Sequence, residues 1–350
     1  MKLKFFSSFF VALCLTGLTF AQNQVIGYFP YWAQYSQYKP ADIHFERVSE
    51  LRYASLVPAA DGSVGLADEM DAVNFDSLVV QAAKHSVPLI VAVGGPDAAD
   101  AFTAIAGDEA LRSTFAKSVA EWVNRYNLAG VELDWQGLTS DNAENFSALF
   151  SELKNACPGK SVGIAVYPVS VDAYGESLHS ADFATVFIAN QMSVDSATVR
   201  PNLSLSDVSA SMNLFAAKGV DKKKMSVVVS LSGMSFSGAS GLGSSHQGIG
   251  SGNEGLWSYK DLMARFDTPD YKVSFDEASS SEVAVGNGET IIFSGIPSVK
   301  AISSWIRDNG FGGVALYDVS EDHPEAIVSL FVTAGQVLRP GVNYAPAKKK

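Results

Sequence analysis

A short apolar segment of the chain carries two carboxylic acids and an amide at alternating positions. Residues 130–136 read Gly-Val-Glu-Leu-Asp-Trp-Gln. Successive strand side chains point to opposite faces of a sheet, so Glu132, Asp134 and Gln136 share one face, about 6.6 Å apart along the strand. Buried polar groups lose solvation energy unless they hydrogen-bond to one another or to a ligand. The segment therefore predicts a site for acid–base chemistry or polar-ligand binding, or else a buried polar network without a ligand.

The strand that carries these residues belongs to a regular series of apolar segments. Eight segments rich in Val, Ile, Leu and Ala predict strands, and stretches with helical periodicity lie between them. Almost continuously apolar strands are buried on both faces, as in a parallel sheet covered by helices. The sequence therefore predicts an α/β protein built as a (β/α)8 TIM barrel, with Trp135 facing the helices. The predicted strands are residues 25–29, 51–57, 87–93, 130–134, 161–167, 184–192, 225–231 and 313–317, and predicted helices include 75–85, 111–126, 143–156 and 205–217.

One interval is too long for a barrel loop. Between the seventh and eighth strands, the chain is rich in Gly and Ser over residues 237–252, becomes helix-like by residues 257–266, and is strand-like over residues 289–293. We expect residues 236–295 to form a small α+β insertion between the seventh strand and seventh helix, on the face of the barrel where such folds bind ligands. The barrel is predicted to span residues 22–340, followed by a disordered tail over residues 341–350.

Composition limits the classes of partner. The 350 residues carry a net charge of −12 with 47% hydrophobic and 18% charged residues, so a large core is expected and nucleic acid is excluded as a partner. Lys2 and Lys4 precede an apolar run over residues 5–20, and Thr19-Phe20-Ala21 resembles a signal-peptidase site. We expect residues 1–21 to be a signal peptide, the mature protein to be secreted, and no later segment to span a membrane. Two cysteines and five scattered histidines predict no metal site, and no cofactor is expected.

The fourth strand resembles that of glycoside hydrolase family 18, the chitinases and their relatives. The family pattern is Asp-Gly-x-Asp-x-Asp-x-Glu, and residues 129–136 here read Ala-Gly-Val-Glu-Leu-Asp-Trp-Gln. The resemblance extends over almost the whole mature chain. Further similar segments are residues 28–35, which contain Tyr28 and Trp32, residues 92–95, residues 192–195 (Met-Ser-Val-Asp, where the family has Met-x-Tyr-Asp on the sixth strand), residues 232–236, residues 252–259, and residues 312–317, which end in Tyr317 where the family has Trp.

The resemblance implies a reaction in which the acetamide of the substrate itself attacks the anomeric carbon. It implies that a Glu at position 136 is the general acid, that an Asp at position 132 orients the acetamide, and that a Tyr at position 194 hydrogen-bonds to it. Gln136 has no proton to donate, Glu132 is one methylene longer, Val194 has no hydroxyl, and Ala129 lacks a carboxylate. We therefore expect a degenerate, non-catalytic member. By the same resemblance, the expected sugar contacts are Tyr28, Trp32, Met192, Asp195 and Tyr317.

Three hypotheses about function follow. The first is a secreted pseudo-glycosidase that binds chitin, another N-acetylglucosamine-containing glycan or another polysaccharide in the barrel cleft. The second is a scaffold that binds a protein partner in a surface assembly. The third is a weak glycoside hydrolase with a displaced acid, for which Glu132 or Glu254 would have to reach the glycosidic oxygen.

Overall fold

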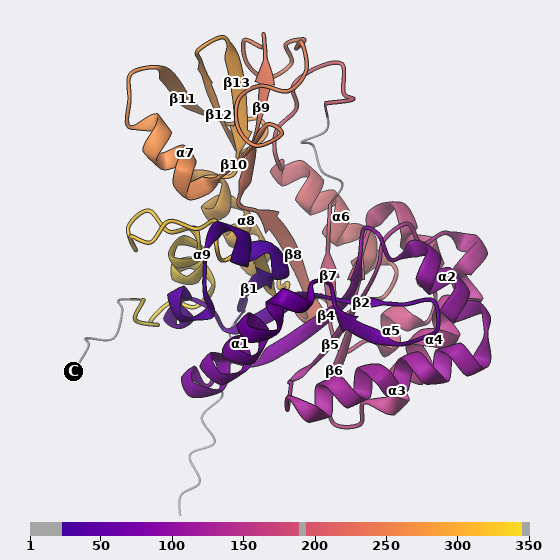
Figure 1. Cartoon of the computed structure of the whole chain (residues 1–350). Helices are drawn as coiled ribbons and strands as arrows, with labels where there is room; N and C mark the ends of the chain where they lie inside the picture. The colour runs from indigo at the N-terminus through magenta and orange to yellow at the C-terminus, as the bar shows by residue number, and fades with distance from the viewer. Residues whose placement is uncertain (1–22, 189–193, 345–350) are drawn as a thin grey trace, which may run out of the picture.

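The computed structural model describes residues 23–188 and 194–344, and in this part of the chain eight parallel strands close into a barrel (Figure 1). Closure occurs at β1, which pairs in parallel with both β14 and β2. The fold class predicted from the sequence is confirmed. The barrel strands are β1 (Gln24–Pro30), β2 (Glu50–Pro58), β4 (Leu89–Gly95), β5 (Gly130–Trp135), β6 (Ser161–Val166), β7 (Ala184–Val186), β8 (Met225–Ser230) and β14 (Gly313–Tyr317), and β3 (Val64–Leu66) adds antiparallel to β2.

Helices cover the outside of the barrel, and several begin at a side-chain cap. Asp108 accepts hydrogen bonds from the first backbone N–H groups of α3, and Ser204 and Ser329 do the same for α6 and α9. Such caps satisfy donors that have no partner within the helix. The helices around the barrel are α1 (Ala72–His85), α2 (Ala99–Gly107), α3 (Glu109–Arg125), α4 (Ala143–Ala156), α5 (Ser177–Ser180), α6 (Leu205–Ala217), α8 (Ile296–Asp308) and α9 (Leu330–Leu338).

Alternation along the strands separates two apolar layers. On β5, Trp135 is buried and packs between Phe102 of α2 and Phe146 of α4, with ring centroids 5.3 and 6.2 Å away. The inward positions of other strands form a separate cluster inside the barrel, which includes Tyr28 and Ala54. Glu132, Asp134 and Gln136 therefore face the interior, as the alternation predicts.

The insertion is an antiparallel sheet that begins earlier than the predicted boundary at residue 236. Within residues 232–293, the strand order is β10-β9-β13-β12-β11, and the sheet rises above the barrel (Figure 1). Only Leu231 separates β8 from β9. Its backbone N–H donates to the carbonyl of Tyr317, and its carbonyl accepts from the backbone N–H of Tyr259. The elements are β9 (Ser232–Ser237), β10 (Leu256–Ser258), α7 (Tyr259–Phe266), β11 (Tyr271–Asp276), β12 (Ser281–Gly286) and β13 (Glu289–Phe293).

Two other predicted boundaries differ from the structure. The sixth barrel strand, β7, ends at Val186 rather than at residue 192, and Met192 lies outside the described residues. The predicted tail began at residue 341, but Tyr344 is buried against α9 and donates a hydrogen bond to the carbonyl of Arg339 at 3.1 Å. Its ring lies where a side chain at Gly335 would otherwise stand, so Gly335 permits this close contact. Within the described residues, no helix is long and apolar enough to cross a membrane.

Candidate functional site

A cavity of about 670 Å³ opens at the carboxyl ends of the barrel strands. We call it the cleft. Its lining includes most of the residues that the sequence nominates, although these come from distant parts of the chain. The nominated residues that line it are Tyr28, Trp32, Glu132, Asp134, Gln136 and Tyr317. This is the face of a TIM barrel on which ligands bind.

Aromatic rings form one wall of the cleft. Trp32 is 41% exposed, and its ring lies 6.1 Å from that of Tyr317, centroid to centroid. Tyr317 in turn lies 4.9 Å from Tyr28, and Phe187 lies 6.0 Å from Tyr28. Such a series of rings offers apolar faces on which sugar rings can stack. The sequence nominated all of these except Phe187, which directly follows β7.

Glu132 lies at the bottom of the cleft in a buried ion pair. Its carboxylate pairs with the guanidinium of Arg52 on β2 and accepts a hydrogen bond from the Tyr28 hydroxyl at 2.7 Å. Arg52 also donates to Glu50 at 2.9 Å and to the hydroxyl of Thr185. Burial alone would lower the pKa of Arg52, but the neighbouring Glu132, Tyr28 and Glu50 raise it, so the guanidinium stays charged.

This ion pair bears on the hypothesis that Glu132 is a displaced acid. Glu132 and Arg52 are each 1% exposed, although Glu132 contributes to the lining of the cleft. The carboxylate of Glu132 is already engaged by two groups of the protein, the guanidinium of Arg52 and the hydroxyl of Tyr28. Sequence reasoning missed Arg52, although a cation at an inward position of a buried strand is a signal for a partner.

Asp134 is the carboxylate that faces the cleft. It accepts hydrogen bonds from the Tyr167 hydroxyl at 2.8 Å and from the Gln136 amide at 3.2 Å. Burial raises the pKa of Asp134 to about 6, against the two hydrogen bonds, which favour the charged form and lower it. Gln136 thus acts as a neutral donor to Asp134, in the place where the family pattern has an acid.

Of the expected contacts after the sixth strand, Met192 lies outside the described residues, and Asp195 does not line the cleft. Phe187 and Ile188 follow β7 into the cavity, whereas Val194 packs on the apolar cluster of the insertion. Asp195 is exposed and is not among the residues that line the cleft. The absence of a hydroxyl at Val194 is therefore no evidence about catalysis. Glu254 is likewise exposed, at a turn of the insertion, and does not line the cavity.

A second carboxylate pair, not found from the sequence, lies behind the wall of the cleft. Glu321 accepts a hydrogen bond from the hydroxyl of Ser232, which itself lines the cavity, with oxygen–oxygen distances of 2.7 and 2.9 Å. Burial raises the pKa of Asp318 and of Glu321, and the negative charge of Asp318 raises that of Glu321 further. The raised pKa values favour the neutral forms of both carboxyl groups.

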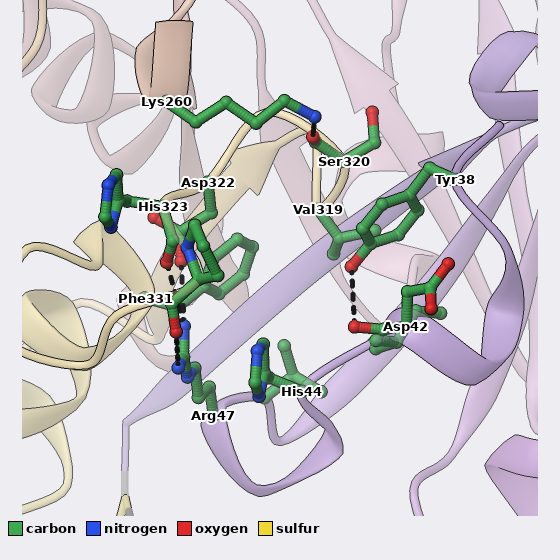
Figure 2. Close-up of a pocket in the computed structure, with 13 residues that line it drawn as sticks. Tyr38, Asp42, His44, Arg47, Lys260, Val319, Ser320, Asp322, His323 and Phe331 are labelled. Atoms are coloured by element: carbon green, nitrogen blue, oxygen red, sulfur yellow. Dashed lines mark hydrogen bonds and ion pairs between the residues drawn. The ribbon is translucent and has the colours of Figure 1, made fainter. Parts of the chain in front are cut away.

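A smaller cavity of about 220 Å³ lies beside the segment that follows β14 (Figure 2). The Lys260 ammonium donates to the carbonyl of Ser320 at 2.7 Å, which joins α7 to this segment. The buried guanidinium of Arg47 donates to the carbonyls of His323 and Pro324 and lies 3.5 Å from Asp322. These contacts hold the segment that carries Tyr317 and Glu321 in place. Among the described residues, no group of three or more His, Cys, Asp or Glu is arranged to hold a metal ion.

The fold is a TIM barrel with a cleft at the carboxyl ends of its strands, and comparisons identify the family. The sequence profile of Glycosyl hydrolases family 18 matches residues 24–322, and the chain belongs to this family. Chitinase 1 of Aphanocladium album is 20% identical, covering 84% of this chain and 80% of its own length. A chitinase-like mite allergen of Dermatophagoides pteronyssinus is 21% identical, with 85% and 71% covered. The Group IV chitinase of Ostrinia furnacalis, solved with allosamidin, superposes with a TM-score of 0.84 at 20% identity, covering 92% of this chain and all of that one (100%).

The buried ion pair gives a first prediction. Arg52→Met or Glu132→Gln should each lower the free energy of unfolding by about 3–5 kcal/mol, because the partner charge is left buried without compensation. The double variant should lose less than the sum of the two. Chemical denaturation measures all three. Lys218→Met, which removes an exposed ion pair with Asp172, is the control and should change stability little. Additive losses would contradict direct coupling of Arg52 and Glu132.

The hydrogen bond to Asp134 gives a second prediction. Tyr167→Phe should raise the pKa of Asp134 further above about 6, because it removes a donor that favours the charged form. Carboxyl-carbon NMR titration measures the pKa. Tyr35→Phe, whose hydroxyl donates to Asp68 outside the cleft, should leave it unchanged. A lower pKa in Tyr167→Phe would refute the assignment.

The same raised pKa sets a pH dependence of stability. Because the folded-state pKa of Asp134 lies above the ordinary value of 3.8, its contribution to stability is complete below that pH and is lost as the pH rises through about 6. The Asp134→Asn variant should lack this pH-dependent part of the free energy of unfolding.

Proposed function

We propose that this family 18 protein binds a chitin-type glycan in its cleft and does not hydrolyse it. One observation carries the proposal: the position of the family's catalytic acid holds Gln136, whose amide donates to Asp134. The next carboxylate below, Glu132, is paired with Arg52. The carboxyl groups that line the cleft are those of Asp97, Glu132 and Asp134, and none of them stands at the position of the family's acid, so the cleft keeps polar groups for binding.

The aromatic wall supports binding of a sugar chain. Trp32 is the most accessible of its rings, and Tyr317 and Tyr28 extend the apolar surface toward the bottom of the cleft. Among structures with the same fold, a Cycas revoluta chitinase mutant that includes a glutamate-to-glutamine substitution is in complex with (GlcNAc)4. That chain superposes with a TM-score of 0.81 at 21% identity. By analogy, chito-oligosaccharides are the first ligands to test.

We further propose that residues 1–21 direct secretion, which would bring the cleft to extracellular glycans. The scaffold hypothesis remains the second candidate, and it predicts a stable protein partner with no affinity for sugars. A weak hydrolase would need an acid other than Glu132 or Glu254.

Binding can be measured by isothermal titration of the mature protein with (GlcNAc)4. We expect Trp32→Ala to weaken affinity by about tenfold, because stacking on an exposed aromatic ring contributes about 1–1.5 kcal/mol. Tyr35→Ala is the matched control, since Tyr35 lies in the same short helix but does not line the cleft. If wild type and Trp32→Ala bound (GlcNAc)4 with equal affinity, the aromatic wall at Trp32 would be excluded as the binding surface. No binding at all would favour the scaffold hypothesis.

Absence of hydrolysis can be tested with a fluorogenic chitobioside. We expect no turnover by the wild type and none comparable to active family members by Gln136→Glu. The new carboxyl would lose the amide's hydrogen bond to Asp134, and Glu132 would remain paired with Arg52. Efficient cleavage by Gln136→Glu would show that the remaining residues of the cleft are still competent, and turnover by the wild type would overturn the proposal.

A further inference from the structure

The charges that line the cleft are all of one sign. Asp97, Glu132 and Asp134 line it, and the described lining residues include no Lys, Arg or His. Glu132 is neutralised from below by Arg52. Asp134 accepts hydrogen bonds from neutral donors, and Asp97 is exposed, so neither charge is compensated by a cation of the cleft lining.

Two cationic side chains, Arg52 and Lys260, bind other groups of the protein. Arg52 is shared between Glu132 and Glu50 below the cleft. Lys260 extends into the smaller cavity, on the side of Tyr38, and donates to the carbonyl of Ser320 (Figure 2). Neither ammonium nor guanidinium is among the groups that face the cleft.

The carboxyl groups behind the cleft wall add little to this charge. Burial raises the pKa of Glu321 to about 8 and that of Asp318 to about 6, so at pH 6.5 the negative charge facing the ligand space rests on Asp97 and Asp134. Glu321 is linked to the cleft wall through Ser232. A low-dielectric pocket with one sign of charge attracts ligands of the opposite sign.

From this arrangement, we infer that the cleft selects glycans with protonated amino groups, that is, partly or fully deacetylated N-acetylglucosamine polymers, over fully acetylated or acidic chains. The inference rests on the proposed function and specifies its ligand class. An ammonium group has three donors and no acceptor, and a carboxylate has about four acceptor positions. Asp134 uses two of them, for Tyr167 and Gln136, so it can accept further hydrogen bonds from a ligand.

The test compares three tetrasaccharides by isothermal titration at about pH 6.5, which lies below the pKa of an ordinary α-amino group and above the pKa of about 6 of Asp134. These are (GlcNAc)4, its fully deacetylated counterpart (GlcN)4, and an oligogalacturonate of equal length. We expect (GlcN)4 to bind about tenfold more tightly than (GlcNAc)4 and to lose most of this advantage at about 0.5 M salt, where charges are screened. The oligogalacturonate should not bind measurably.

Variants locate the effect. Asp97→Asn should weaken (GlcN)4 binding by about threefold or more and weaken (GlcNAc)4 binding by a smaller factor, because it removes charge but keeps shape. Asp100→Asn is the control, since Asp100 is exposed on α2 and does not line the cleft. Equal or tighter binding of (GlcNAc)4 by the wild type, or equal effects of Asp97→Asn on both ligands, would overturn the inference and leave the proposed function intact. Failure of all three sugars to bind would remove both.

Discussion

The buried ion pair between Arg52 and Glu132 is the constraint on which the interior of this barrel depends. Charged groups inside a protein lose hydration, and only close pairing with further hydrogen bonds compensates for that loss. Here the compensation comes from four strands, because Tyr28, Arg52, Glu132 and Thr185 lie on β1, β2, β5 and β7. The same contacts that hold these strands together engage the carboxylate of Glu132, so this residue of the family's fourth-strand pattern has a structural role.

Above this ion pair, the cleft has a different character. Asp134, Tyr167 and Gln136 form a half-buried network in which the amide and hydroxyl donate to a single carboxylate. Gln136 stands in this network where the family pattern has an acid, and its amide is a donor to Asp134. The carboxylate of Asp134 is therefore hydrogen-bonded by neutral donors and not by a cation.

Much of the fold follows from the sequence, because each barrel strand is a short apolar run, and on β5 polar and apolar side chains alternate. Alternation alone placed Trp135 among the helices and Asp134 inside. Two features could not be read in this way. Residues 192–195 resemble the family's sixth-strand pattern in sequence. In the structure, however, β7 ends at Val186, and Phe187 and Ile188 line the cleft. The partnership of Arg52 with Glu132 joins residues 80 positions apart, and no local pattern encodes it.

The passage from β8 to β9 through the single residue Leu231 means that one extended run serves two sheets at once. Val228, Ser230 and Ser232 all face the cavity, so the alternation of the barrel continues without a break into the insertion. If this insertion were exchanged for that of another family member, the number of residues between β8 and β9 would have to stay the same, so that alternate side chains still face the cavity. One residue more or less would turn Ser232 away and present Gly233 instead, and Glu321 would lose its hydroxyl partner.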